Sequence, residues 1–471
     1  MRRTLFCLLF VSYAYFYQGG GWNQNSRFAL VRAITSDWSL RIDPYQANTG
    51  DKAFFDGHYY SDKAPGLALA ALPAVEPVRL AYLAAGGDPE TFAGLALLSW
   101  VATIFTVGLL TAYAGVVLFD LATIWGASNR AATFAVLTFG LTTPIWFMAT
   151  IFIGHALSAA CLLLAYGAAT RVSAERRFAR ARSVDSVVDR ARDRRHGWLV
   201  GVGAGWATVS EFPAAVPAIL LALWTVWSAW PLGPSRLRRI AGTMTAGALL
   251  CAGVLMLYQY ACFGSPFHLA YSSEQGDFSG MHQGLFGITR PTWSSLYQVL
   301  IGEYRGLLPL APVMFVAPLG LYLQARRCPD ARPAILVAAA IALFYVLLNA
   351  SYFYWEGGWS LGPRHLTPAL PFLSLGLPAL WTAGGRLGRT ALLAAALAGF
   401  VVSLAAVSTM VQPPANVARP FREIVWPAFR DGDLSLKTQT FVHHTVDPSL
   451  WRTHQEPKAA FNLGMKLGLD G

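Results

Sequence analysis

Long apolar segments, separated by short polar ones, dominate the pattern of the chain. A helix needs about 20 mostly apolar residues to cross a bilayer. Six segments of about this length contain no charged residue: 92–119, 240–263, 306–324, 334–350, 366–384 and 390–411. This pattern predicts an all-α, polytopic membrane protein.

Breaks within two other apolar regions predict two pairs of helices. Thr143 and Pro144 interrupt the first region, and Glu211 and Pro213 interrupt the second. The four helices are expected at 131–147, 149–170, 198–210 and 212–230.

Residues 4–18 form a short apolar stretch that follows two arginines. No small-x-small cleavage motif follows this stretch, so we interpret it as an uncleaved first helix rather than a signal peptide. It brings the expected number of transmembrane helices to about eleven.

The distribution of arginines indicates how the helices are oriented. Segment 171–195 carries nine arginines and four acidic residues, and further arginines lie within 236–239, 326–332 and 386–389. Loops rich in Lys and Arg stay in the cytoplasm. These loops and the N-terminus share that side only if the apolar, proline-rich segment 64–84 does not cross. We therefore expect 64–84 to form interfacial or re-entrant helices on the outer side.

The same assignment divides the chain into a membrane domain and a tail. Residues 1–411 are expected to form the transmembrane domain, and residues 412–471 an extracytoplasmic tail. Within the domain, we expect a first outer loop at 19–91, a basic cytoplasmic loop at 171–197 and a second outer loop at 264–305.

The composition excludes several other classes of protein. Only 13% of the residues are charged and 55% are hydrophobic, whereas soluble domains carry roughly 25% charged residues. This excludes a soluble globular enzyme, a disordered chain and a protein that binds nucleic acid through a basic surface. The five cysteines show no CxxC or CxxH spacing, so we expect neither a structural disulfide nor a thiolate metal site.

The densest group of polar residues lies at 49–66, just before an apolar segment. It contains three carboxylates, two lysines, a histidine and two tyrosines. Carboxylates at a membrane surface can act as general bases, and a lysine can neutralise a phosphate. The alternative is a charged turn that caps an interfacial helix.

Two arginines stand at the outer ends of apolar segments. Arg364, followed by His365, precedes segment 366–384, and Arg305 precedes segment 306–324. A helix N-terminus favours anions, and the planar fork of an arginine suits a phosphate. The alternative is that each arginine only anchors its helix among lipid headgroups.

Three further polar positions have weaker signals. His155 lies about one turn inside an apolar helix, where a histidine is more often a packing group, and Glu211 marks a helix boundary. Asp431 and Asp433 form a DxD pattern, but Asp-Gly-Asp is also a common turn. We therefore predict no metal site.

Three motifs of the first outer loop occur in an order known from one superfamily. They are QNSRF at 24–28, SDW at 36–38 and YSDKAP at 60–65. Their order resembles the D-E-x-R-[YF], G-D-W and Y-x-E-K-P-P motifs of the GT-C polyprenyl-phosphate-sugar glycosyltransferases, in the branch of the protein O-mannosyltransferases and the lipid A aminoarabinose transferases. The sequences DKAPG and GPRHL are similar to those of an uncharacterised bacterial subgroup. The resemblance covers roughly the first half of the chain.

The resemblance implies that a sugar passes from a polyprenyl-phosphate donor to a glycan, lipid or protein acceptor. The transfer would invert the sugar and take place on the outer side of the bacterial cytoplasmic (inner) membrane. Membrane lipids would be further partners, nucleic acid is not expected as one, and a divalent metal is not indicated. Because Gln24 stands where the family has its catalytic Asp, another acid would have to be the base.

The resemblance assigns roles to particular residues. The preferred base is Asp62, followed by Asp51 and Asp56. The donor phosphate would contact Lys63, Arg364, Arg305 and Arg27. Substrate contacts are expected from Gln24, Tyr60, His155, Glu211 and His365.

Two other kinds of function stay open at the level of the sequence. A transporter or lipid flippase usually has ionisable residues or broken helices near the membrane midplane, and the six uncharged segments contain no such charge. A non-catalytic GT-C-like membrane protein would account for Gln24. A donor-dependent activity would distinguish an enzyme from both.

Overall fold

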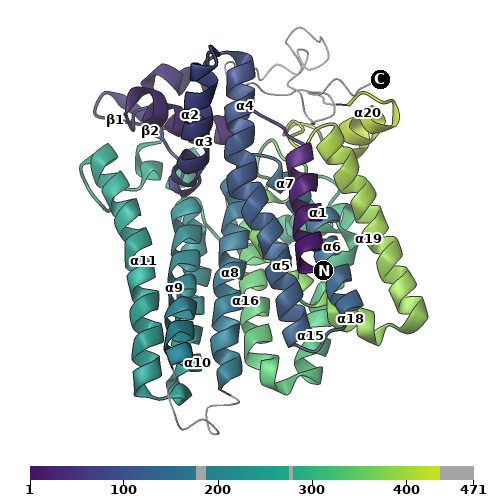
Figure 1. Ribbon diagram of the computed structural model, residues 1–471. Coiled ribbons are helices and arrows are strands. Elements are labelled where there is room, and N and C mark those ends of the chain that lie inside the picture. The colour runs from purple at the N-terminus through teal and green to yellow at the C-terminus, as the bar shows by residue number, and fades with distance from the viewer. Residues whose placement is uncertain (177–186, 275–278, 435–471) are drawn as a thin grey trace.

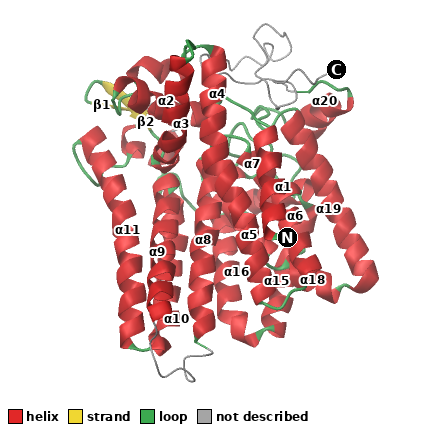
Figure 2. Cartoon of the chain, viewed as in Figure 1, coloured by secondary structure: helices red, strands yellow, loops and turns green. Residues whose placement is uncertain are grey.

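The computed structural model describes residues 1–176, 187–274 and 279–434. It shows a bundle of long helices with a smaller group of elements at one end, which we call the upper end (Figure 1). The upper end holds α2 (Trp22–Asp37), the hairpin of β1 (Lys52–Phe55) and β2 (His58–Ser61), and α3 (Gly66–Ala84). Within the described residues, this hairpin is the only β-sheet (Figure 2).

The bundle helices follow the hydrophobic pattern of the sequence. The N-terminal half contributes α1 (Arg2–Tyr15), α4 (Phe92–Thr103), α5 (Leu109–Ile124), α6 (Asn129–Leu141), α7 (Ile145–Ala149), α8 (Gly154–Glu175), α9 (Val187–Ser210), α10 (Ala215–Ala229) and α11 (Pro234–Phe263). The C-terminal half contributes α12 (Trp293–Leu300), α13 (Leu307–Leu310), α14 (Pro312–Phe315), α15 (Ala317–Arg327), α16 (Arg332–Ser351), α17 (Leu370–Ser374), α18 (Leu377–Ala383), α19 (Gly385–Ser408) and α20 (Trp426–Arg430). Helix α9 packs along α8 and α11, and α5 packs against α1, α6 and α8. The all-α polytopic architecture expected from the sequence is confirmed.

The number of membrane-spanning helices differs from the expected eleven. Among the described residues, seven helices are long and apolar enough to cross a membrane, and one bent pair at 364–383 raises the number to at most eight. The segments expected at 4–18 and 131–147 give helices α1 and α6 of only 14 and 13 residues. The segment 306–324 is divided among α13, α14 and α15, because prolines interrupt it. The count of eleven is therefore not confirmed.

Helix α3 occupies the segment that we expected not to cross the membrane. By length and composition α3 is one of the seven candidates, although Pro73 and Pro77 lie inside it. It packs against α2 and α4 at the upper end of the bundle (Figure 1). This position suits an interfacial helix, and its relation to the membrane stays a prediction.

The arginine-rich segments gather at the opposite, lower end of the bundle. The ends of α8 and α15 and the starts of α9 and α11 lie there (Figure 1). Residues 177–186 of the predicted basic loop lie outside the described residues, whereas 187–195 form the first turns of α9 rather than part of a loop. The buried Asp193 accounts for this order, because it pairs with Arg236 at 2.6 Å and with Arg239 at 3.0 Å.

A tight turn sets the register of the hairpin that leads into α3. Asp56 and Gly57 both have positive φ, 48° and 80°, as a two-residue hairpin turn requires. Lys52 pairs with Ser61 across the strands, so Asp51 and Asp62 come to lie at the same end of the hairpin. The hairpin was not predicted from the sequence.

Candidate functional site

Lys63 is held between two carboxylates at the open end of the hairpin. Its Nζ lies 2.6 Å from Oδ2 of Asp62 and 3.1 Å from Oδ2 of Asp51. Asp62 is fully buried, and its Oδ1 accepts a hydrogen bond from Ser26 of α2 at 3.4 Å. The strand pairing and α2 together therefore fix the positions of both acids.

Burial and charge pairing have opposite effects on the pKa values of Asp62 and Lys63. Burial raises the pKa of Asp62 to about 6, although the Lys63 ammonium lowers it. Burial alone would lower the pKa of Lys63, but Asp51 and Asp62 outweigh this effect and raise it well above its ordinary value. At neutral pH the lysine is thus charged and Asp62 is largely ionised.

A second ion pair joins three parts of the chain beside the first. The buried Arg27 donates to Oε1 of Glu211 at 2.8 Å and to the carbonyl of Ala64 at 2.9 Å. Its Nε donates to Asn23 at 3.0 Å. Arg27 therefore ties α2 to the start of α3 and to the break between α9 and α10, which leaves it little capacity for a ligand.

Two histidines form a perpendicular pair next to Glu211. The rings of His155, in the first turn of α8, and His365 are 5.1 Å apart at 76°. Nδ1 of His155 lies 3.6 Å from Oε1 of Glu211. Nε2 of each histidine is buried without a hydrogen-bond partner. Because buried polar groups are normally satisfied, these two atoms suggest a polar ligand.

Arg364 supplies a positive charge that no carboxylate neutralises. It begins the short helix Arg364–Ala369, is partly buried, and its Nε has no hydrogen-bond partner. No ion pair joins it to an acid of the described chain. Its charge nevertheless acts on Glu211 and Tyr352, as does that of Lys63. Lys63 and Arg364 thus belong to one electrostatic environment, and the anion that they were expected to share stays a prediction.

We call the group Asp51, Asp62, Lys63, Arg27, Glu211, His155, His365 and Arg364 the polar cluster. Gln24 adds a buried amide whose nitrogen and oxygen both lack a hydrogen-bond partner. An amide of this kind can donate to one ligand hydroxyl and accept from another.

Three predicted site residues have other surroundings. Arg305 is completely buried and donates to the carbonyls of Tyr304, Glu356 and Gly358. Its guanidinium therefore stabilises a turn and is not directed toward a phosphate. Asp56 is exposed at the tip of the hairpin, about 10–13 Å from the end that holds Asp62, at roughly 3.3 Å per residue. Tyr60 packs on the ring of Phe263 at 5.2 Å.

The structure adds residues of the second outer loop that sequence reasoning missed. Glu274 forms a β-bridge with Ala53 of β1. Burial, together with the charges of Asp62 and Asp51, raises the pKa of Glu274 to about 8, although the charge of Lys63 lowers it. The ring of Tyr271 lies 6.0 Å from Nζ of Lys63. Nothing in the sequence near Glu274 indicated this long-range pairing.

No group of three or more His, Cys, Asp or Glu side chains in the described ranges is arranged to hold a metal ion.

No family model matches the chain, and no curated protein matches it. Solved structures are similar in fold. ArnT from Cupriavidus metallidurans bound to undecaprenyl phosphate aligns with a TM-score of 0.52 and 17% identity over 91% of this chain and 69% of that chain. The apo oligosaccharyltransferase of Archaeoglobus fulgidus aligns with a TM-score of 0.51 and 12% identity over 88% and 56%.

A third solved structure is AglB of Archaeoglobus fulgidus in complex with an inhibitory peptide and a dolichol-phosphate. It aligns with a TM-score of 0.51 and 11% identity over 95% of this chain and 61% of that chain. The chain thus spans less than two thirds of the archaeal proteins. At these identities the likeness concerns the fold alone.

Proposed function

We propose that the protein transfers a sugar from a polyprenyl-phosphate donor to a hydroxyl acceptor at the outer surface of the membrane. The observation that carries this proposal is Arg364, a cation without an acidic partner among the described residues, near two histidines whose buried Nε2 atoms lack a hydrogen-bond partner there. An anionic ligand at the end of an apolar bundle would satisfy all three side chains. The fold likeness to proteins bound to undecaprenyl phosphate and dolichol-phosphate supports a lipid-linked phosphate as this ligand.

The donor phosphate would bind between Arg364 and Lys63. An arginine fork offers two parallel hydrogen bonds to phosphate oxygens, and the Lys63 ammonium adds a second positive charge. The N-terminus of α8 at Gly154 contributes a partial positive charge close to His155. The prenyl chain would leave the site along the apolar helices.

The reaction would be a single displacement. The acceptor oxygen forms a bond to the anomeric carbon while the bond from that carbon to the phosphate oxygen breaks, so the configuration inverts. The proton of the acceptor hydroxyl passes to Asp62, and the electron pair stays on the departing polyprenyl phosphate. Lys63 and Arg364 stabilise this charge where it develops.

The environment of the polar cluster divides the work between two carboxyl groups. With a pKa of about 6, Asp62 is ionised at neutral pH and can accept a proton. With a pKa of about 8, Glu274 is protonated at neutral pH and can donate a hydrogen bond to a substrate oxygen. Two carboxyls whose pKa values are pushed apart are typical of acid–base catalysis.

Binding and product analysis together test the proposal. The purified protein in nanodiscs should bind undecaprenyl phosphate, and Arg364→Gln should weaken binding about 10- to 100-fold, because hydrogen bonds to charged groups contribute about 1.5–3 kcal/mol. Arg41→Gln is the matched control, since Arg41 is exposed in the same outer region.

Mass spectrometry of cell-envelope glycans and lipids, with and without the chain, should reveal a product that differs by one sugar. Unchanged binding of undecaprenyl phosphate by Arg364→Gln would contradict the proposed phosphate site. Identical envelopes would favour a non-catalytic protein or a flippase instead.

A further inference from the structure

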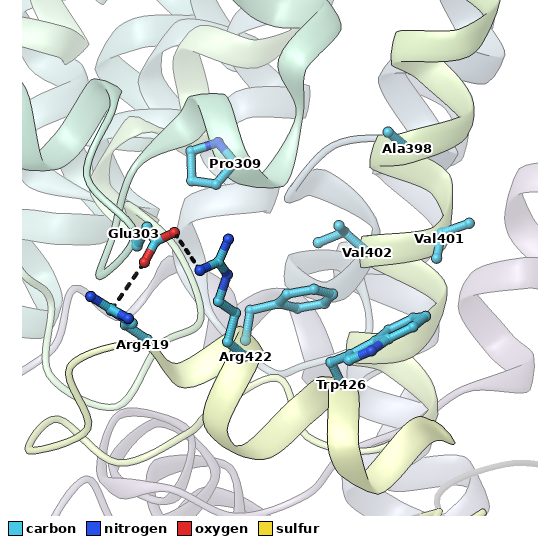
Figure 3. A pocket seen from close by; sticks show the side chains of 9 residues that line it. Glu303, Pro309, Ala398, Val401, Val402, Arg419, Arg422 and Trp426 are labelled. Atoms are coloured by element: carbon cyan, nitrogen blue, oxygen red, sulfur yellow. Dashed lines mark ion pairs between the residues drawn. The ribbon is translucent and has the colours of Figure 1, made fainter. Parts of the chain in front are cut away.

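A groove of about 550 Å³ lies between α19 and the C-terminal segment (Figure 3), and none of its lining residues belongs to the polar cluster. Val401 and Val402 of α19 line the groove, as do Phe421 and Trp426 of the C-terminal segment. Figure 3 shows the charged side chains of the groove gathered at one side of these apolar groups. The groove is therefore amphipathic.

Two arginines share one carboxylate at the charged side. Nε of Arg419 lies 3.1 Å from Oε2 of Glu303, and Nη1 of Arg422 lies 3.1 Å from Oε1. Both guanidinium groups are more than half exposed. Glu423 is nearby, but its carboxylate accepts from the backbone N–H of Arg419. Glu303 thus pairs with both arginines, and Glu303 and Glu423 together balance the two positive charges.

The position of the groove near the end of α19 would suit the boundary between headgroups and acyl chains. Val401 lies seven residues before Ser408, the last residue of α19, which is about 10 Å along a helix axis. The arginines lie on the segment that follows this end, and Trp426 beside them is partly exposed. Arginine and tryptophan are enriched at this level of a membrane protein.

We propose that this groove binds a membrane phospholipid, with the phosphodiester on Arg419 and Arg422 and an acyl chain along Val401 and Val402. The two exposed arginine side chains can each donate hydrogen bonds to the phosphate oxygens. The apolar wall on a helix that is itself a candidate span supplies the surface for the chain. The site is independent of the proposed sugar transfer.

Native mass spectrometry of the full chain tests the site with phosphatidylglycerol as the probe. The double variant R419Q/R422Q should retain at least about tenfold less of this lipid than the parent protein, since two charge-assisted contacts are removed. Ala398→Trp, on the exposed side of the same wall, should also reduce retention while the arginines stay in place. Inorganic phosphate at equal concentration should not displace the lipid.

Arg430→Gln is the matched control, because Arg430 is similarly exposed and, within the described part of the chain, pairs only with Asp431. It should retain the lipid like the parent. Equal losses in R430Q and R419Q/R422Q would overturn the site, as would equal retention of phosphatidylglycerol and uncharged diacylglycerol. Displacement by inorganic phosphate would show a free anion site and would also contradict the proposal.

Discussion

Complete burial and the nearby Lys63 ammonium have opposite effects on the pKa of Asp62. Burial raises its pKa, yet Lys63 at 2.6 Å keeps the group ionised near neutral pH. Asp62→Asn is nearly isosteric and removes the proton acceptor, so we expect a loss of about 10²–10⁴-fold in turnover. The measurement is sugar transfer from the lipid donor at saturating concentration.

Asp56→Asn is the control for this substitution. Asp56 sits at the exposed hairpin tip with φ of 48°, and Asn is well tolerated in that conformation. Near-normal turnover is expected. A large loss in Asp56→Asn with little loss in Asp62→Asn would transfer the catalytic role away from Asp62.

Asp62 and Glu274 together predict a bell-shaped pH dependence. Asp62 must lose its proton to act as the base, so the rate should rise as pH increases through about 6. Glu274 must keep its proton to donate a hydrogen bond, so the rate should fall as pH increases through about 8. Because the two groups interact, the two apparent pKa values read from the profile belong to the pair and not to either residue alone.

Glu274→Gln distinguishes this assignment from a merely structural role. The amide still donates a hydrogen bond but cannot ionise, so the fall above about pH 8 should disappear while the rise near pH 6 remains. A profile of kcat against pH measures this. An unchanged alkaline limb would assign that limb to another group.

At the scale of the elements, close backbone contact fixes the start of α3 beside the polar cluster. A Cβ at Gly66 would lie 2.6 Å from Oγ of Ser210 and 2.7 Å from the carbonyl of Val209, at the end of α9. Gly66→Ala should therefore destabilise the protein by about 1–3 kcal/mol. Thermal unfolding in detergent measures the change.

Gly242→Ala provides the matched comparison within α11. A Cβ there would meet nothing within 4 Å, and alanine is favoured over glycine inside a helix by about 1 kcal/mol. This variant should be as stable as the parent or more so. Equal destabilisation by both substitutions would show that the α3–α9 contact is not tight.

Local patterns predicted some elements, and long-range contacts decided the others. The uncharged segments 92–119, 334–350 and 390–411 were recognised because a helix in lipid must be apolar along its length. The hairpin could have been predicted, since Asp56-Gly57 between aromatic residues is a typical hairpin turn. The hydrogen bonds of Arg305 to Glu356 and Gly358, and the position of Glu274 near Asp62, depend on contacts between segments far apart in the sequence. A single sequence does not reveal such contacts.

At the scale of the whole molecule, the polar cluster and the arginine-rich segments occupy opposite ends of the bundle. The helices between the two ends are apolar, and the pairs that Asp193 forms with Arg236 and Arg239 lie at the lower end. Positively charged loops stay in the cytoplasm, so the upper end should face the outside. The donor phosphate and the acceptor would then meet on the outer surface.

Cysteine labelling in intact cells tests this orientation. In a background where the exposed Cys7 is replaced by serine, Ala47→Cys places a thiol in an exposed position at the upper end, and Ser235→Cys places one at the lower end. A membrane-impermeant maleimide should label the first without treatment and the second only after permeabilisation. Labelling of Ser235→Cys alone in intact cells would invert the orientation and move the site to the cytoplasm. Labelling of both would contradict the separation of the two ends by a membrane, because no fold with these ends on one side could bury its apolar helices in lipid.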